Sequence, residues 1–214
     1  HDIFRDVWDS VTHTLGVKLA AGTSNIGDVD VLSIAAGATV IGKVGVDQTT
    51  EGTTNRVVAG KASVLTVTPV VDTAIYAAGD VLFTGTEVTS AARASGLGLT
   101  LLGVSVIDKD DEGAQLTIHF FDADPTFGTI NGAPSISDAN TAKWLGKVDI
   151  AAADYIDLGG AKVAHIAPGS SDDAFPNPVI PATGTSIWIA ATTTGTPTYT
   201  AATDIVVRLH VFQD

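Results

Sequence analysis

The stretch Asp204-Ile205-Val206-Val207-Arg208-Leu209-His210-Val211-Phe212 decides the fold class. Positions 207, 209 and 211 are Val, Leu and Val, whereas Arg208 and His210 lie between them. A period of two places alternate side chains on opposite faces of a β-strand, and one of the two faces here is entirely apolar. We therefore predict a strand over 204–212 that turns one face toward a hydrophobic core.

Segments of the same kind recur toward the N-terminus, separated by turns rich in Gly, Pro, Asn and Asp. Many short strands with such turns are typical of an antiparallel sandwich. The sequence therefore predicts an all-β fold, an antiparallel β-sandwich resembling a jelly roll, over residues 61–214. The remaining strands are expected at 63–71, 80–84, 98–107, 115–121, 147–150, 155–158, 161–166 and 186–191.

Three connections between these strands have features of their own. The acidic segment 108–113 is expected to be a hairpin turn between two strands, and the proline-rich segment 168–184 a loop that cannot pair as a central strand. A short helical turn is expected at 138–145, because Ser137 or Asp138 can cap it and Trp144 can pack inward.

A repeat precedes the sandwich. Ala21-Gly22-Thr23-Ser24-Asn25-Ile26-Gly27-Asp28-Val29-Asp30-Val31 is answered 15 residues later by Ala36-Gly37-Ala38-Thr39-Val40-Ile41-Gly42-Lys43-Val44-Gly45-Val46. Two such units cannot bury a core alone, because stacked repeats need neighbours to cover their apolar faces. We therefore expect residues 1–60 to supply an anchor and a β-repeat stalk, built with other copies of the chain as a homotrimer. The stalk contacts would come from Ile26, Val29, Val31, Ile41, Val44 and Val46.

Composition limits the partners of the chain. The net charge of −13 opposes a phosphate backbone, and the sequence has no cluster of Lys or Arg to offset it, so nucleic acid is not expected as a partner. No apolar run approaches the roughly 20 residues of a membrane helix, so no membrane partner is expected either. The absence of Cys excludes disulfides and Cys-ligated zinc.

The sequence contains no motif that points to catalysis or to a cofactor. His1, His13, His119, His165 and His210 lack the close spacing of a metal site, and no nucleophile elbow, phosphate loop or dinucleotide fingerprint is present. Asp108, Asp110, Glu112 and Gly113 begin like a calcium loop, but its twelfth position is His119, where a bidentate Glu is required. We expect no enzyme activity, no cofactor and no metal.

Sugar binding is the alternative that the residues leave open. Aromatic rings form stacking platforms in binding sites. The residues available for one are Trp8, Trp144, Trp188, Tyr155 and Tyr199.

The repeat, the continuation Asp47-Gln48-Thr49-Thr50 and the segments 72–82 and 195–202 resemble structural proteins of tailed-bacteriophage virions, of the capsid decoration (cement) or head-fibre type. The resemblance covers about residues 7–214 and carries no catalytic residues with it. It implies a decoration protein on the outer surface of the head, with the major capsid protein or another virion protein as partner. Ile3, Phe4, Val7 and Trp8 would then form the anchor to that partner. The alternative is a tail or head-fibre protein whose sandwich binds a host-surface glycan or receptor.

Overall fold

The structure is a computed structural model that describes residues 8–9, 14–15, 60–167 and 179–213. The chain divides into two compact units, residues 1–51 and 52–214. In the first unit, β1 (Trp8–Asp9) pairs antiparallel with β2 (Thr14–Leu15), with the backbone of Trp8 in register with that of Leu15. The second unit contains all the other elements of the described residues.

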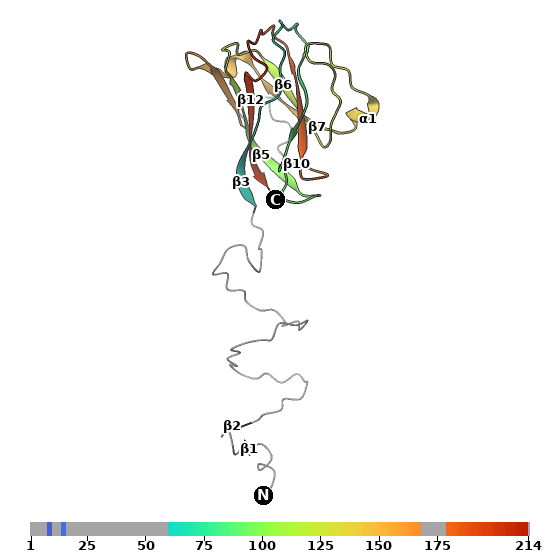
Figure 1. Cartoon of the computed structure of the whole chain (residues 1–214), viewed down its shortest axis with the longest axis vertical. Coiled ribbons are helices and arrows are strands. Elements are labelled where there is room, and N and C mark those ends of the chain that lie inside the picture. The colour runs from blue at the N-terminus through green and yellow to red at the C-terminus, as the bar shows by residue number, and fades with distance from the viewer. Residues whose placement is uncertain (1–7, 10–13, 16–59, 168–178, 214) are drawn as a thin grey trace. The chain divides into compact units, whose positions relative to one another are not determined.

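The second unit is built from two antiparallel sheets (Figure 1). The larger sheet has the order β3-β12-β5-β9-β8, and β10 pairs with β5 as well. The smaller sheet has the order β4-β11-β6-β7. The bounds in the larger sheet are β3 (Lys61–Val67), β5 (Gly98–Asp108), β8 (Tyr155–Asp157), β9 (Lys162–Ile166), β10 (Val179–Pro181) and β12 (Ile205–Gln213). Those in the smaller sheet are β4 (Val81–Val88), β6 (Leu116–Phe121), β7 (Trp144–Ile150) and β11 (Ile187–Thr193).

The pairing of the strands is nested. β6 pairs with β7, β5 with β9 and β10, β4 with β11, and β3 with β12. The chain from β3 to β12 therefore behaves as one long hairpin rolled up so that its successive pairs alternate between the two sheets. This is the jelly-roll arrangement, and it confirms the predicted all-β sandwich.

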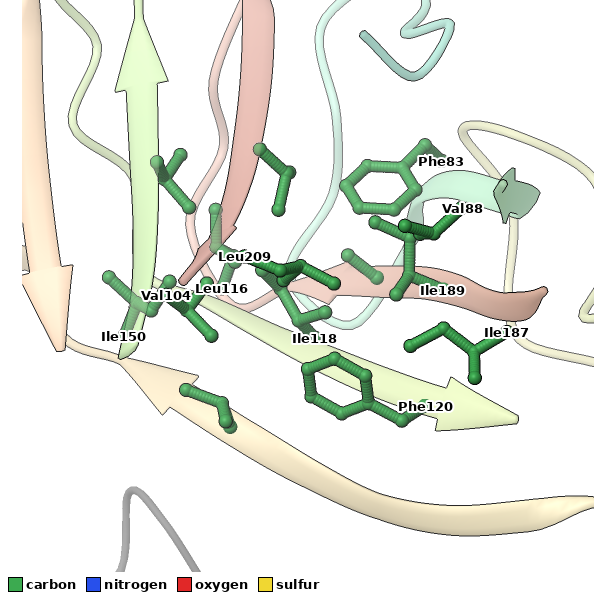
Figure 2. Packing of buried hydrophobic residues seen from close by; sticks show 14 of the residues in the cluster. Phe83, Val88, Val104, Leu116, Ile118, Phe120, Ile150, Ile187, Ile189 and Leu209 are labelled. Atoms are coloured by element: carbon green, nitrogen blue, oxygen red, sulfur yellow. The ribbon is translucent and has the colours of Figure 1, made fainter. Parts of the chain in front are cut away.

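The core lies between the two sheets. Val104 and Leu209 of the larger sheet face Leu116, Ile118 and Phe120 of the smaller sheet (Figure 2). All five side chains are buried, as the alternation in the sequence requires. The predicted strand 204–212 is confirmed as β12, whose residues 205, 207, 209 and 211 point into the core.

A second apolar cluster lies on the outer side of the smaller sheet. Phe121 of β6 and Ala190 of β11 are buried there against Phe127, which belongs to the segment that follows β6. The Phe121 and Phe127 rings meet edge to face with centroids 5.7 Å apart. The connection between β6 and β7 thus covers part of this outer face.

Several predicted local features differ from the structure. The segment 108–113 is not a hairpin turn: β5 belongs to the larger sheet and β6 to the smaller, so the segment crosses between sheets. Both edges of β5 are occupied by other strands, β12 on one side and β9 and β10 on the other, which leaves β6 no place beside it.

The helical turn is shorter than predicted. Helix α1 (Asp138–Thr141) begins after Ser137, whose hydroxyl accepts a hydrogen bond from the backbone N–H of Asn140, as a cap should. Trp144 already belongs to β7 and is 47% exposed, so the expectation that it packs inward is wrong. A register shift in the β6–β7 pairing sets Trp144 opposite Phe121, which points to the outer side of the sheet.

The proline-rich segment is not loop throughout. Residues 179–181 form β10, with Pro181 opposite Gly98 of β5. Among the described strands, β10 pairs only with β5, which makes it an edge strand, the place in a sheet where proline is tolerated.

Candidate interaction surface

The outer face of the larger sheet is the most distinctive surface of the described residues. Four cross-strand rows define it. They are Val206–Ile107–Val163–Ile156, Thr66–Arg208–Ser105–His165, Val64–His210–Gly103 and Ala62–Phe212–Thr100, to which the bulged residue Leu102 is added. We call these residues the outer face. None of them is Asp or Glu, although the whole chain has 24 such residues.

Large apolar side chains are exposed on this face. Ile156 is 67% exposed, Val64 54%, Leu102 47% and Phe212 39%. A shallow hollow of about 290 Å³ lies among Ala62, Ser63, Val64, Leu102, His210 and Val211. Val64, Leu102 and Phe212 lie on neighbouring strands, whereas Ile156 lies beyond the polar row Thr66–Arg208–Ser105–His165. Scattered apolar residues are normal on protein surfaces, but a group of neighbours on one sheet is a common mark of an interaction site.

A polar cluster lies in the middle of the face. Ser105 Oγ is 2.8 Å from His165 Nδ1 and 3.0 Å from His210 Nε2. The two imidazole rings meet edge to face with centroids 5.1 Å apart. The geometry around His165 is tight, because a Cβ at Gly103 would come within 2.8 Å of His165 Cε1. Glycine at this position therefore makes room for the second ring.

The charge state of this cluster depends on its surroundings. Burial lowers the pKa of His210, and the positive charges of His165 and Arg208 lower it further. A neutral His210 can share the Ser105 hydroxyl with His165. A nitrogen of one of the two rings donates to the oxygen, and a nitrogen of the other ring accepts the hydroxyl proton. Arg208 is the one Lys, Arg, Asp or Glu among the outer-face residues.

The outer side of the smaller sheet has a different character. Lys147 and Asp149 form an ion pair of 2.6 Å there, and Thr117 donates a hydrogen bond of 2.6 Å to the same carboxylate. His119 packs against Phe127, with ring centroids 5.1 Å apart and the ring planes tilted by 38°. Burial, with a smaller contribution from Lys147, lowers the pKa of His119 to about 4.

The aromatic residues proposed as a sugar platform do not form a single surface. Tyr199 is buried in the core and Tyr155 packs against it, so neither ring is available for stacking. Trp188 and Trp144 lie on either side of Phe121 across three neighbouring strands. Phe127 packs on Phe121 and covers the middle of this group of three rings, so that only Trp144 and Trp188 are left to contact a sugar.

The acidic segment after β5 is held by its own backbone. Asp108 is fully buried and accepts hydrogen bonds from the N–H groups of Asp110, at 3.0 Å, and Gly113, at 2.8 Å. Burial raises the pKa of Asp108 despite these bonds. Asp110 in turn accepts bonds from the backbone and hydroxyl of Thr200. Within the described ranges, no group of three or more His, Cys, Asp or Glu is arranged to hold a metal ion.

Nine of the ten predicted anchor and stalk residues lie outside the described residues. These are Ile3, Phe4 and Val7 of the anchor and all six stalk residues, Ile26, Val29, Val31, Ile41, Val44 and Val46. Trp8 of the anchor is described, in β1. The outer face was not predicted from the sequence, although the even-numbered residues of 204–212 were already recognisable as the side of that strand opposite the core.

The chain matches no model of a known protein family and no curated protein. Among the described residues, no helix is long and apolar enough to cross a membrane.

Proposed function

We propose that the chain is a non-enzymatic structural protein of a tailed-bacteriophage virion, a decoration or cement protein that binds the outer surface of the head as a homotrimer. The observation that carries this proposal is the outer face of the larger sheet. It exposes Val64, Leu102, Ile156 and Phe212 and is free of carboxylates, in a chain with a net charge of −13. Such a face favours association, while the acidic remainder keeps the assembly soluble.

The N-terminal part supplies the attachment in this proposal. Residues 1–60 carry the apolar and aromatic anchor Ile3, Phe4, Val7 and Trp8, followed by the 15-residue repeat. A single short anchor binds weakly. Three anchors joined in one trimer gain avidity, because the first contact raises the effective concentration of the other two.

The test is the position of the protein on virions of the phage that encodes it. Gold-labelled antibodies against the chain should mark many sites spread over the head. Purified chain added to heads that lack it should also raise the temperature at which they open. Absence of the chain from purified particles would overturn the proposal.

One observation favours the alternative, a tail or head-fibre protein that binds a host-surface glycan. Trp144 is exposed and lies with Trp188 on the same side of the smaller sheet, on either side of Phe121. Exposed indole rings stack on sugar faces. Label confined to a few copies at the tail, together with loss of cell binding in Trp144→Ala, would support this alternative.

A further inference from the structure

We propose that the outer face of the larger sheet is the contact between copies of this chain, so that the sheets of neighbouring subunits meet across Val64, Leu102 and Phe212. The inference rests on the proposed function, because it names the surface by which the decoration protein assembles. Its occupant is a second copy of the same chain.

The two outer sides of the sandwich are treated differently by the fold. On the smaller sheet, Phe121 and Ala190 are buried because the segment after β6 lies over them and contributes Phe127. On the larger sheet, Gly60 lies against one edge of the Phe212 ring, but Val64, Leu102 and Phe212 remain 39–54% exposed. Burying such exposed apolar area against a partner removes it from water and contributes favourably to the free energy of association.

Charge favours a second copy as that partner. Most surfaces of this acidic chain would repel one another, as would the carboxylates of Glu87 and Asp149 on the smaller sheet. The outer face has no carboxylate, and its histidines and Arg208 lie among apolar side chains. It is therefore a surface on which two copies can meet without placing carboxylates against each other.

The connection between the N-terminal repeat and β3 also favours a second copy of the chain as the partner of the outer face. Ala62, Val64 and Thr66 of β3 form one edge of the outer face, and β3 is the strand that directly follows residues 1–60 with their repeat. If the repeats of several copies associate, as expected from their alternating apolar residues, the β3 strands that continue them are tethered at high local concentration.

The area of the outer face indicates that residues 1–60 and the outer face both contribute to the contact between subunits. Four strands about 4.8 Å apart, over about six residues rising about 3.3 Å each, present roughly 400 Å² of flat area. A standard interface buries about 800 Å² per partner. The outer face therefore supplies a substantial part of a stable contact, and we assign the remainder to residues 1–60.

The experiment measures the mass of the full chain by light scattering over a range of concentrations. One chain has a mass of 21.8 kDa, and the wild type is expected at three times that value. Leu102→Glu places a carboxylate in the middle of the outer face and should raise the concentration needed for assembly at least tenfold. Ala62→Glu is the second variant, since Ala62 is an exposed residue at the edge of the face and its replacement disturbs no core packing. Far-UV circular dichroism establishes that each variant is folded.

The matched control is Ile75→Glu, because Ile75 is a comparably exposed apolar residue that is not part of the outer face. It should assemble like the wild type, and equal dissociation of this control would overturn the inference. Retention of the trimer in both face variants would also overturn it, while leaving the proposed function intact. A wild type that is monomeric at every concentration would overturn the homotrimer itself. If that monomer bound heads and Leu102→Glu abolished the binding, the face would dock a capsid protein instead of a second copy.

Discussion

Ser105 Oγ lies 3.0 Å from His210 Nε2, although 105 residues separate the two in the chain. His165 reaches the same oxygen from the other side. A serine hydroxyl has a single proton, so it can donate a hydrogen bond to only one of the two imidazoles. The other imidazole must then donate to the hydroxyl oxygen. If both rings become protonated, both nitrogens must donate, the hydroxyl proton loses its acceptor, and two cations face each other. The geometry therefore disfavours protonation of both rings together.

This relationship predicts how His210 titrates. The groups that face it are His165 from β9, Ser105 from β5, Arg208 on its own strand and the uncharged Val64 from β3. We expect its pKa to lie below the usual 6.5, and His165→Gln to raise it, because the variant removes a neighbouring positive charge. Nuclear magnetic resonance titration of the imidazole protons measures both values. Arg208→Gln should act in the same direction, and an unchanged His210 pKa in both variants would contradict this account.

His119 predicts a loss of stability in mild acid. Its pKa is about 4 in the folded protein and about 6.5 in the unfolded chain, so folding favours the neutral ring. The stabilisation is complete above pH 6.5 and declines as the pH falls toward 4, by up to about 3 kcal/mol. His119→Phe keeps a ring against Phe127 but cannot titrate. Urea unfolding at several pH values should therefore give a flatter profile for this variant than for the wild type. Parallel profiles would assign the acid sensitivity to other groups.

Asp108 should be important for stability. Asp108→Ala leaves the backbone N–H groups of Asp110 and Gly113 without their acceptor, at a cost of about 2–4 kcal/mol in the free energy of unfolding. The control is Glu112→Ala in the same segment, where the side chain is exposed and the change should stay within about 0.5 kcal/mol. Chemical denaturation measures both. Equal effects of the two substitutions would show that the buried carboxylate does not hold the crossover between the sheets.

Ile118 tests the packing between the sheets. Its side chain is fully buried between them (Figure 2), so Ile118→Ala should lower the free energy of unfolding by about 2–5 kcal/mol and Ile118→Val by about 1 kcal/mol. Ile75→Ala, at an exposed position, should have little effect. Thermal and urea unfolding measure the three variants. A loss in Ile118→Ala no larger than that in Ile75→Ala would contradict the core described above.

Much of the fold follows from local pattern. The alternation at 204–212 gave the correct strand and the correct buried face, because a period of two is a property of the backbone that needs no partner to be recognised. The cap at Ser137 was also predictable, since it is satisfied by the N–H of Asn140 only three residues away.

Pairing between distant strands was not accessible in the same way. The segment after Asp108 has the composition of a hairpin turn, but whether two consecutive strands pair depends on which other strands compete for their edges. β12 and β9 occupy the edges of β5, so the chain crosses to the other sheet. Trp144 likewise points outward because of a register shift beside Phe121, and the residues next to Trp144 in the sequence do not predict that shift.

The sequence by itself therefore determined the all-β class, most of the strands and the apolar side of the strand at 204–212, because these depend on neighbours within a few residues. Only the tertiary structure decided that Ser105, His165 and His210 meet. It also decided that the outer sides of the two sheets, whose strands alternate in a similar way, differ in how far other segments cover them. One is covered by Phe127 from its own chain and the other is left open at Leu102. The physical reason is that coverage depends on where a connecting segment runs in space, which the period of a strand does not encode.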